Sequence, residues 1–215
     1  MNKEEADSVA LRCAIFASGG GSNFQALINR KESGDLHVDF VLMVGNNSTA
    51  GAFEKARKHN IPSVHLAPSH FKSPDDYQSR LLAVLQEYRV ELIVLAGYMK
   101  MLPSEVVHLY HNRIVNIHPG LLPAFGGKGM YGSRVHQAVL DYGAKITGVT
   151  VHFVNEEYDE GPVICQAPVK VNDTDDCQTL AGRVLEVEHS TYWRAIEAIA
   201  KGVIRVEGRR VTGYV

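Results

Sequence analysis

The stretch CAIFASGGGSNFQALINRK, residues 13–31, contains the transition that decides the fold. It opens with an unbroken apolar run, passes through three consecutive glycines, and continues with the mixed polar and apolar residues of a surface helix. A strand that is apolar on both faces is typical of a parallel sheet covered by helices on both sides. The stretch therefore predicts the first strand and helix of a doubly wound α/β domain.

The rest of the first half repeats this alternation. Strand-like runs at 38–46, 62–67 and 91–97 alternate with helical segments at 50–60 and 75–89, the run at 62–67 being the weakest. Consecutive βα units form a parallel sheet with right-handed crossovers.

The second half is expected to complete the sheet. It reads as a strand, a glycine- and proline-rich loop, a helix, two strands, a long helix and a terminal hairpin, at 113–118, 120–132, 133–143, 146–154, 162–171, 177–201 and 203–215. We predict one domain with a Rossmann-like three-layer α/β/α fold. Its sheet is mostly parallel, with an antiparallel strand in the C-terminal half and a short C-terminal hairpin.

Composition and charge exclude several classes of protein. The formal net charge of −2 does not favour a nucleic-acid partner. The longest apolar stretch, 92–99, is too short to span a bilayer, and the acidic segment 1–12 lacks the apolar core of an export signal. Three cysteines without paired spacing predict neither a disulfide framework nor a metal site. We expect a cytoplasmic protein, monomeric or homodimeric, without metal, nucleic acid or membrane as a partner.

The glycine loop SGGGSN, residues 18–23, is a candidate anion site. Backbone N–H groups at such a strand-to-helix junction point outward toward a ligand. Phe24 stands where a dinucleotide-binding loop needs a small residue, and no Gly-Lys-Ser/Thr follows. Two interpretations remain: a phosphate monoester bound by Gly21, Ser22 and Asn23, or a tight turn capped by Ser22 or Asn23.

Asn116 and His118 form a second candidate site in IVNIHPGLLP, residues 114–123. Residues two apart on a strand share a face, and ligands of open α/β sheets bind beyond the carboxyl ends of the strands. An amide donor suits a developing oxyanion, and an imidazole suits acid–base chemistry. The alternative is that Asn116 caps a turn and His118 is a satisfied buried imidazole.

The loop within 151–163 contains four acidic residues between two strands, and Asp159 stands just before the return at Gly161-Pro162. A solvated charge is the default reading for Glu156, Glu157 and Glu160. A carboxylate beside His118 would raise the pKa of the imidazole and keep it protonated near neutrality. Asp159 could lean inward to this position, or it could be a solvated charge like the other three acids.

Five segments together resemble a known family. They are ASGGGSNFQAL, LAGYMKMLP, NIHPGLLPAF, GVTVHFVNEEYDEGPVI and EVEHSTYW, in this order and spread from about residue 12 to 202. The chain resembles the folate-dependent formyltransferases, and its glycine loop and Glu188-His189 pair narrow the resemblance to the glycinamide ribonucleotide branch, enzymes of purine synthesis.

The resemblance implies roles for individual residues. The catalytic set would be Asn116, His118 and Asp159. The ribonucleotide would be bound by Gly21, Ser22, Asn23 and Glu188. The folate would be bound by Met99, Lys100, Met101, Leu102, Asn116, Asn155, Glu156, Glu157, Tyr158 and Asp159, with Lys72 replacing an arginine of some relatives. Residues 12–112 would form the ribonucleotide half of the domain and 113–202 the catalytic and folate half.

The implied reaction moves the formyl group of 10-formyltetrahydrofolate, a co-substrate, to the amine of phosphoribosylglycinamide in de novo purine (IMP) biosynthesis, with no metal. Asn116 and protonated His118 would stabilise the oxyanion. Alternatives are a formyltetrahydrofolate hydrolase, which would need an N-terminal regulatory domain, a methionyl-tRNA formyltransferase, which would need a basic C-terminal domain, and a non-catalytic sensor of a phosphorylated metabolite. A sensor has no need for the Asn–His–Asp set, which therefore favours an enzyme.

Overall fold

A seven-stranded mixed sheet forms the centre of the computed structural model, which describes residues 10–214. Its spatial order is β3-β2-β1-β4-β5-β6-β7. The first five strands of the sequence are parallel, whereas β6 runs antiparallel to both of its neighbours. The strands are β1 (Leu11–Ala17), β2 (Val38–Gly45), β3 (Ser63–His65), β4 (Leu92–Leu95), β5 (Ile114–His118), β6 (Ile146–Phe153) and β7 (Val163–Lys170). The predicted mixed sheet with one antiparallel strand is confirmed.

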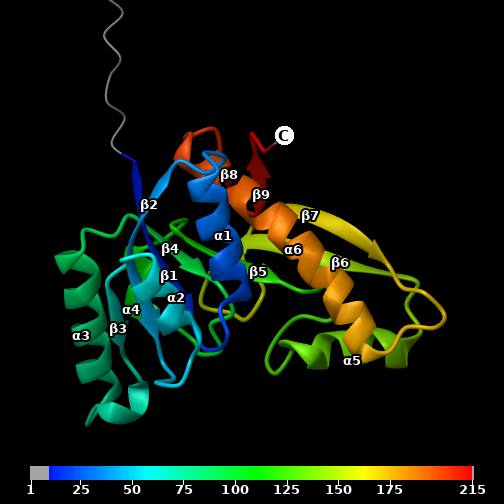
Figure 1. Cartoon of the computed structure of the whole chain (residues 1–215), viewed down its shortest axis with the longest axis horizontal. Helices are drawn as coiled ribbons and strands as arrows, with labels where there is room; N and C mark the ends of the chain where they lie inside the picture. Colours follow the sequence, from blue (N-terminus) through cyan, green and yellow to red (C-terminus); the bar gives the residue numbers. More distant parts are fainter. Residues whose placement is uncertain (1–9, 215) are drawn as a thin grey trace, which may run out of the picture.

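Helices cover both faces of the sheet, as the predicted three layers require (Figure 1). One apolar core joins the sheet to α1 (Ser22–Glu32), α2 (Ala52–Lys58) and α6 (Cys177–Ala200), and a second joins it to α3 (Pro74–Glu87) and α4 (Ser104–Leu109). A smaller cluster packs α5 (Ser133–Tyr142) and α6 against β6 and β7. The structure adds two short helices that were not predicted, η1 (Pro68–His70) and α4.

Local sequence signals explain where the two long helices begin. Ser73 caps α3 by accepting a hydrogen bond from the Asp76 N–H at 3.1 Å, and a proline follows at the first helical position. Asp176 and Thr179 form a reciprocal capping box at the start of α6. These caps satisfy backbone donors that a helix end leaves unpaired, and so they set the starting points of both helices.

The C-terminal hairpin turns where the sequence predicted. It consists of β8 (Arg205–Glu207) and β9 (Arg210–Thr212), with Gly208 at a positive φ of 59° in the turn. Arg209 reaches from this turn to the loop after β6 and donates to the carbonyl of Glu160 at 2.8 Å. Within residues 10–214, no helix is long and apolar enough to cross a membrane. Most of the N-terminal segment considered for an export signal, residues 1–9, lies outside the described residues.

Tyr192 joins α6 to the middle of the sheet. Its side chain is buried, and its hydroxyl lies 2.9 Å from the carbonyl oxygen of Leu95 and 3.1 Å from that of Val115. The two carbonyls belong to the neighbouring strands β4 and β5. The single hydroxyl proton is therefore shared between adjacent strands, close to the sheet edge where β5 ends.

Substituting Tyr192→Phe should lower the free energy of unfolding by about 1–2 kcal/mol, because two buried carbonyls lose a donor without a change of shape. Urea denaturation monitored by circular dichroism measures this change. Tyr142→Phe is the control, since Tyr142 is 80% exposed. Equal stability of the two variants would contradict the role given to the Tyr192 hydroxyl.

Candidate active site

A cavity of about 790 Å³ lies at the carboxyl edge of the sheet. The strand β5 ends there with Asn116 and His118, and the loop after β6 brings Asp159 to the same place. From the other side, α1 contributes Ser22 and Asn23, and α6 contributes Glu188. Residues separated by more than a hundred positions therefore line one cavity. The predicted convergence of the glycine loop, the Asn–His pair and the acidic loop is observed.

The glycine loop leaves open space where a ligand could approach the backbone. A β-carbon added to Gly19 or Gly20 would meet no atom within 4 Å. Gly21 is different, because it has a positive φ of 73° and an added β-carbon would lie 3.0 Å from that of Ala52. Only Gly21 is thus required by the turn itself. The first N–H groups of α1 follow directly and have no partner within their own helix.

Glu188 and Asn23 form a buried polar pair beside this loop. The amide nitrogen of Asn23 donates to a carboxylate oxygen of Glu188 at 2.9 Å. Burial raises the pKa of Glu188 from its usual value of 4.5 to about 7, and the Asn23 hydrogen bond opposes this rise. A buried carboxylate that titrates near neutrality suits recognition of a polar or cationic group of a ligand.

The hydrogen bonds of His118 assign its proton. Its Nε2 lies 2.9 Å from the carbonyl oxygen of Phe125. A carbonyl can only accept, so Nε2 carries the proton in the neutral ring and Nδ1 is left as the acceptor. That Nδ1 lies 3.5 Å from Oδ2 of Asp159. The imidazole therefore presents a basic nitrogen toward the carboxylate.

The expected rise in the pKa of His118 is contradicted. Burial lowers the pKa below its usual value, because the side chain is only 3% exposed and an imidazolium is poorly solvated there. The charge of Asp159 and the Phe125 carbonyl both raise the pKa, but they do not overcome burial. The sequence indicated the carboxylate, and it did not reveal how completely the ring is enclosed. His118 is neutral at pH 7 in this structure.

Asp159 is held in an unusual backbone conformation. Its φ is 58°, in the left-handed region that Asp adopts more readily than most residues. The Gly127 N–H donates to its Oδ2 at 2.9 Å, and Oδ1 lies 3.7 Å from His152 Nε2. The carboxylate is thereby directed inward, between two imidazoles.

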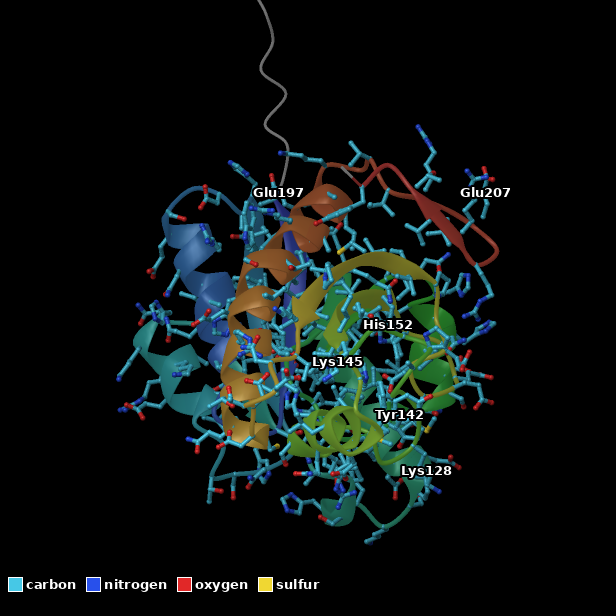
Figure 2. All side chains as sticks on the ribbon, turned by 90° about the vertical axis from the view of Figure 1, so that its right-hand side faces the viewer. Lys128, Tyr142, Lys145, His152, Glu197 and Glu207 are labelled. Atoms are coloured by element: carbon cyan, nitrogen blue, oxygen red, sulfur yellow. The ribbon has the colours of Figure 1, made fainter. Side chains whose placement is uncertain are left out.

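His152 is a site residue that the sequence reasoning missed. Its Nδ1 lies 2.8 Å from the carbonyl of Phe153, which assigns the proton to Nδ1 and makes Nε2 an acceptor. The Asn116 amide nitrogen donates to that Nε2 at 3.1 Å. His152 therefore determines which way the Asn116 amide is turned. Burial lowers the pKa of His152, which keeps it neutral and able to accept. Figure 2 shows His152 in the interior of the molecule.

The only signal for His152 was its place in the TVHFV string, because the pairing of β5 with β6 that sets it opposite Asn116 is not visible in the sequence. A third histidine, His136 of α5, also lines the cavity, and burial lowers its pKa. Lys128 of the long loop is exposed and lies toward the periphery (Figure 2).

One part of the cavity wall combines apolar and polar side chains and adjoins the glycine loop, since the Met99 N–H donates to Oγ of Ser18 at 2.8 Å. The predicted folate residues of two segments line it: Met99, Lys100, Met101, Leu102, Asn155, Glu156, Glu157 and Tyr158. The methionines are about half exposed, although their side chains are apolar. Exposed apolar side chains around a concave site are typical of a surface that binds a flat organic ligand. Lys72 and Gly21 are not among the described residues that line the cavity.

The arrangement suits a group transfer between two different ligands. The glycine loop offers N–H groups, Met99 and Met101 offer an apolar surface, and an amide, an imidazole and a carboxylate line the same cavity. Across residues 10–214, no cluster of three or more His, Cys, Asp or Glu side chains has the geometry to hold a metal ion.

Comparison with known proteins identifies the class of this protein. The formyl transferase family model matches residues 11–196, and the chain belongs to that family. Within the family its similarity is to the phosphoribosylglycinamide formyltransferases. It is 45% identical over 196 residues to the chloroplastic enzyme of Arabidopsis thaliana, covering 90% of this chain and 67% of that one. The chain spans 61% of another plant relative, from Vigna unguiculata.

Solved structures place the fold in the same family. A glycinamide ribonucleotide transformylase from Symbiobacterium toebii superimposes with a TM-score of 0.90 at 35% identity, covering 98% of this chain and 97% of that one. A formyltetrahydrofolate deformylase from Pseudomonas syringae gives a TM-score of 0.85 at 24% identity and is covered over 66% of its length. At that identity the second likeness concerns the fold alone.

The raised pKa of Glu188 predicts a pH-dependent stability. The folded protein holds a proton that the unfolded chain releases near pH 4.5. The stabilisation is therefore complete below pH 4.5 and is lost as the pH rises through about 7. Glu188→Gln removes this dependence. Its melting temperature relative to the parent protein should be higher by a few degrees at pH 8.5 than at pH 5. Calorimetry at both pH values measures the difference, and a pH-independent difference would contradict the burial argument.

Proposed function

We propose that this chain transfers the formyl group of 10-formyltetrahydrofolate to the amine of phosphoribosylglycinamide, giving the formylated ribonucleotide and tetrahydrofolate in purine biosynthesis. The observation that carries the proposal is that Asn116, His118 and Asp159 line one cavity together with the start of α1 and the half-exposed Met99 and Met101. Membership of the formyl transferase family supports the reaction class.

The glycine loop would bind the phosphate of the ribonucleotide. The space above Gly19 and Gly20 and the N–H groups at the start of α1 favour an anion over a merely tight turn. Ser22, Asn23 and Gly21 would form this end of the site, and Glu188 would bind a polar group of the same ligand. The exposed apolar surface of Met99 and Met101 would then contact the pterin ring of the folate.

The hydrogen bonds of His118 suggest how protons move. The neutral amine attacks the formyl carbon, a C–N bond forms, and the carbonyl electron pair moves to oxygen. Asn116, which keeps a second amide proton, donates to that oxyanion. The Nδ1 of His118 accepts a proton from the attacking nitrogen, and Asp159 stabilises the imidazolium. When the bond between carbon and the folate nitrogen breaks, this proton passes to the departing nitrogen.

In this mechanism His118 is neutral before the reaction, whereas the sequence led us to expect it to be protonated from the start. A base has to be unprotonated before the reaction, and the lowered pKa of His118 provides a neutral imidazole at pH 7. Once the ring has taken a proton, the carboxylate of Asp159 stabilises the resulting imidazolium.

The folate hydrolase remains the second candidate, because a deformylase shares the fold. In a hydrolase, water would replace the amine, and the glycine loop would have no substrate phosphate to bind. A cytoplasmic location, a monomeric or dimeric state and a single domain over 1–215 belong to the proposal as expectations. Two plant relatives are named as chloroplastic enzymes, which gives the cytoplasm no additional support.

The first test follows formyl transfer by the purified protein with both substrates. We expect the formylated ribonucleotide to appear at the rate at which tetrahydrofolate is released. Deformylation that proceeds equally without the ribonucleotide would favour the hydrolase, and tight binding of both ligands without turnover would favour a sensor. Asn116→Ala should lower kcat by about 10²–10³, because an oxyanion donor is lost.

Asp159→Asn should lower kcat by at least about 10² and shift the acid limb of the pH profile to lower pH. The neutral amide no longer raises the pKa of His118, so the ring stays unprotonated to a lower pH. Activity falls below this pKa because the protonated ring cannot act as a base. The measurement is kcat against pH for both proteins, with Glu160→Gln as the control, because Glu160 is exposed in the same loop and does not line the cavity. A reduced kcat with an unmoved acid limb would refute the link between Asp159 and His118.

A further inference from the structure

The loop after β5 contacts both groups assigned to catalysis. The carbonyl of Phe125 accepts from His118 Nε2 at 2.9 Å, and the N–H of Gly127 donates to Asp159 Oδ2 at 2.9 Å. These two loop residues flank Gly126. The position of the segment 125–127 therefore sets the direction of the imidazole and of the carboxylate together.

The side chain of Leu122 packs against this segment at Gly126. A β-carbon added to Gly126 would lie 2.4 Å from Leu122 Cδ2 and 3.3 Å from the β-carbon of Asp159. Gly126 is thus packed between the leucine side chain and the carboxylate residue, with no room for a side chain of its own. Any displacement of Leu122 is transmitted to the loop tip, because nothing compressible separates them.

Two side chains hold the backbone of Leu122 on both of its polar groups. Its N–H donates to Oγ1 of Thr150 at 3.0 Å, and its carbonyl accepts from the Gln166 amide nitrogen at 2.8 Å. The same amide nitrogen donates to Thr150 Oγ1 at 3.0 Å. The Thr150 hydroxyl in turn donates to the carbonyl of Gly120 at 2.7 Å. The Thr150 hydroxyl and the Gln166 amide nitrogen thus hold Leu122 and Gly120 in one hydrogen-bonded group.

The clamp is built into the sheet. His118 on β5 pairs with Thr150 on β6, and Thr150 pairs with Gln166 on β7. The three residues form one row across three strands, so the antiparallel strand brings the clamp to the level of the catalytic imidazole. Thr150 is completely buried, whereas Gln166 is exposed except for the amide that reaches inward. Neither Thr150 nor Gln166 is among the described residues that line the cavity.

We propose that Gln166 and Thr150 are positioning residues for the transfer: by holding Leu122 they keep the Phe125 carbonyl on His118 and the Gly127 N–H on Asp159. The proposal rests on the proposed function of this site. The titratable groups that face His118 are Asp159, His152 and His136. Loss of the Phe125 carbonyl removes a contribution that raises the pKa of His118, so that pKa falls further.

The central variant is Gln166→Glu, which keeps the size of the side chain and replaces the amide donor by a carboxylate. The carboxylate would face the Leu122 carbonyl, which is itself an acceptor, so the clamp opens. We expect kcat to fall about tenfold, because catalytic groups shifted by a fraction of an ångström lose alignment, while KM for the ribonucleotide stays within twofold. Gln166→Leu should behave in the same way. The control is Gln137→Leu, since Gln137 is an exposed glutamine of α5 that bonds only to Asp141.

A second measurement does not depend on activity. Titration of the histidine resonances by NMR, with His118 assigned from His118→Asn, should show a lower pKa for His118 in Gln166→Leu, which adds no charge near the ring, than in the parent protein and in Gln137→Leu. Thr150→Ser should retain the kcat of the parent protein because it keeps the hydroxyl. Thr150→Val, which lacks the hydroxyl, should have a lower kcat. Melting temperatures of all variants separate this effect from general destabilisation.

Unchanged kcat and an unchanged His118 pKa in Gln166→Leu would overturn the proposal. A loss of kcat accompanied by an unmoved His118 pKa would also overturn it, because the loss would then have another cause. If the parent protein transfers no formyl group, the proposed function fails. The NMR titration still decides whether the clamp positions His118.

Discussion

The enclosure of His118 is the constraint on which the chemistry of this site depends. The ring is almost fully buried, so charging it is costly, and its pKa lies below the usual value. Asp159 lies 3.5 Å away, and in the proposed reaction its carboxylate would stabilise the ring once the ring has taken a proton. The Phe125 carbonyl assigns the remaining proton to Nε2. Burial, carboxylate and carbonyl together produce a base whose accepting nitrogen faces the Asp159 carboxylate.

The same principle, a polar group controlled by its buried partner, recurs around the cavity. His152 accepts from Asn116 because its own proton is bound to a backbone carbonyl. Burial raises the pKa of Glu188 to about 7, and the amide of Asn23, which donates to its carboxylate, opposes this rise. In each case a neutral partner orients a reactive or recognising group. Charged partners would have changed the ionisation as well as the direction.

Much of the fold followed from periodicity and residue type. The predicted strands and long helices are present with ends within two or three residues, because continuous apolar runs and helix caps are local signals. The convergence of Asn116 and His118 with the glycine loop followed from the rule that ligands bind at the carboxyl ends of strands, and the place of Asp159 followed from the family resemblance. The predicted protonation of His118 was wrong, because the burial that lowers its pKa depends on elements that lie far apart in the sequence. His152 and Gln166 were missed for a related reason: their partners are set by strand pairing.

The sequence by itself determined the alternation of strands and helices, the glycine loop, an amide and an imidazole at the end of a strand, and a carboxylate in a loop. It also carried the family resemblance that named the formyl group. Only the tertiary structure decided which nitrogen of His118 accepts a proton, how Asn116 is turned and why Leu122 stays in place. These properties depend on distances of about 3 Å between side chains and backbone groups that only the folded sheet brings together. A local pattern specifies which groups are available, and the packing of the whole chain specifies which of them touch.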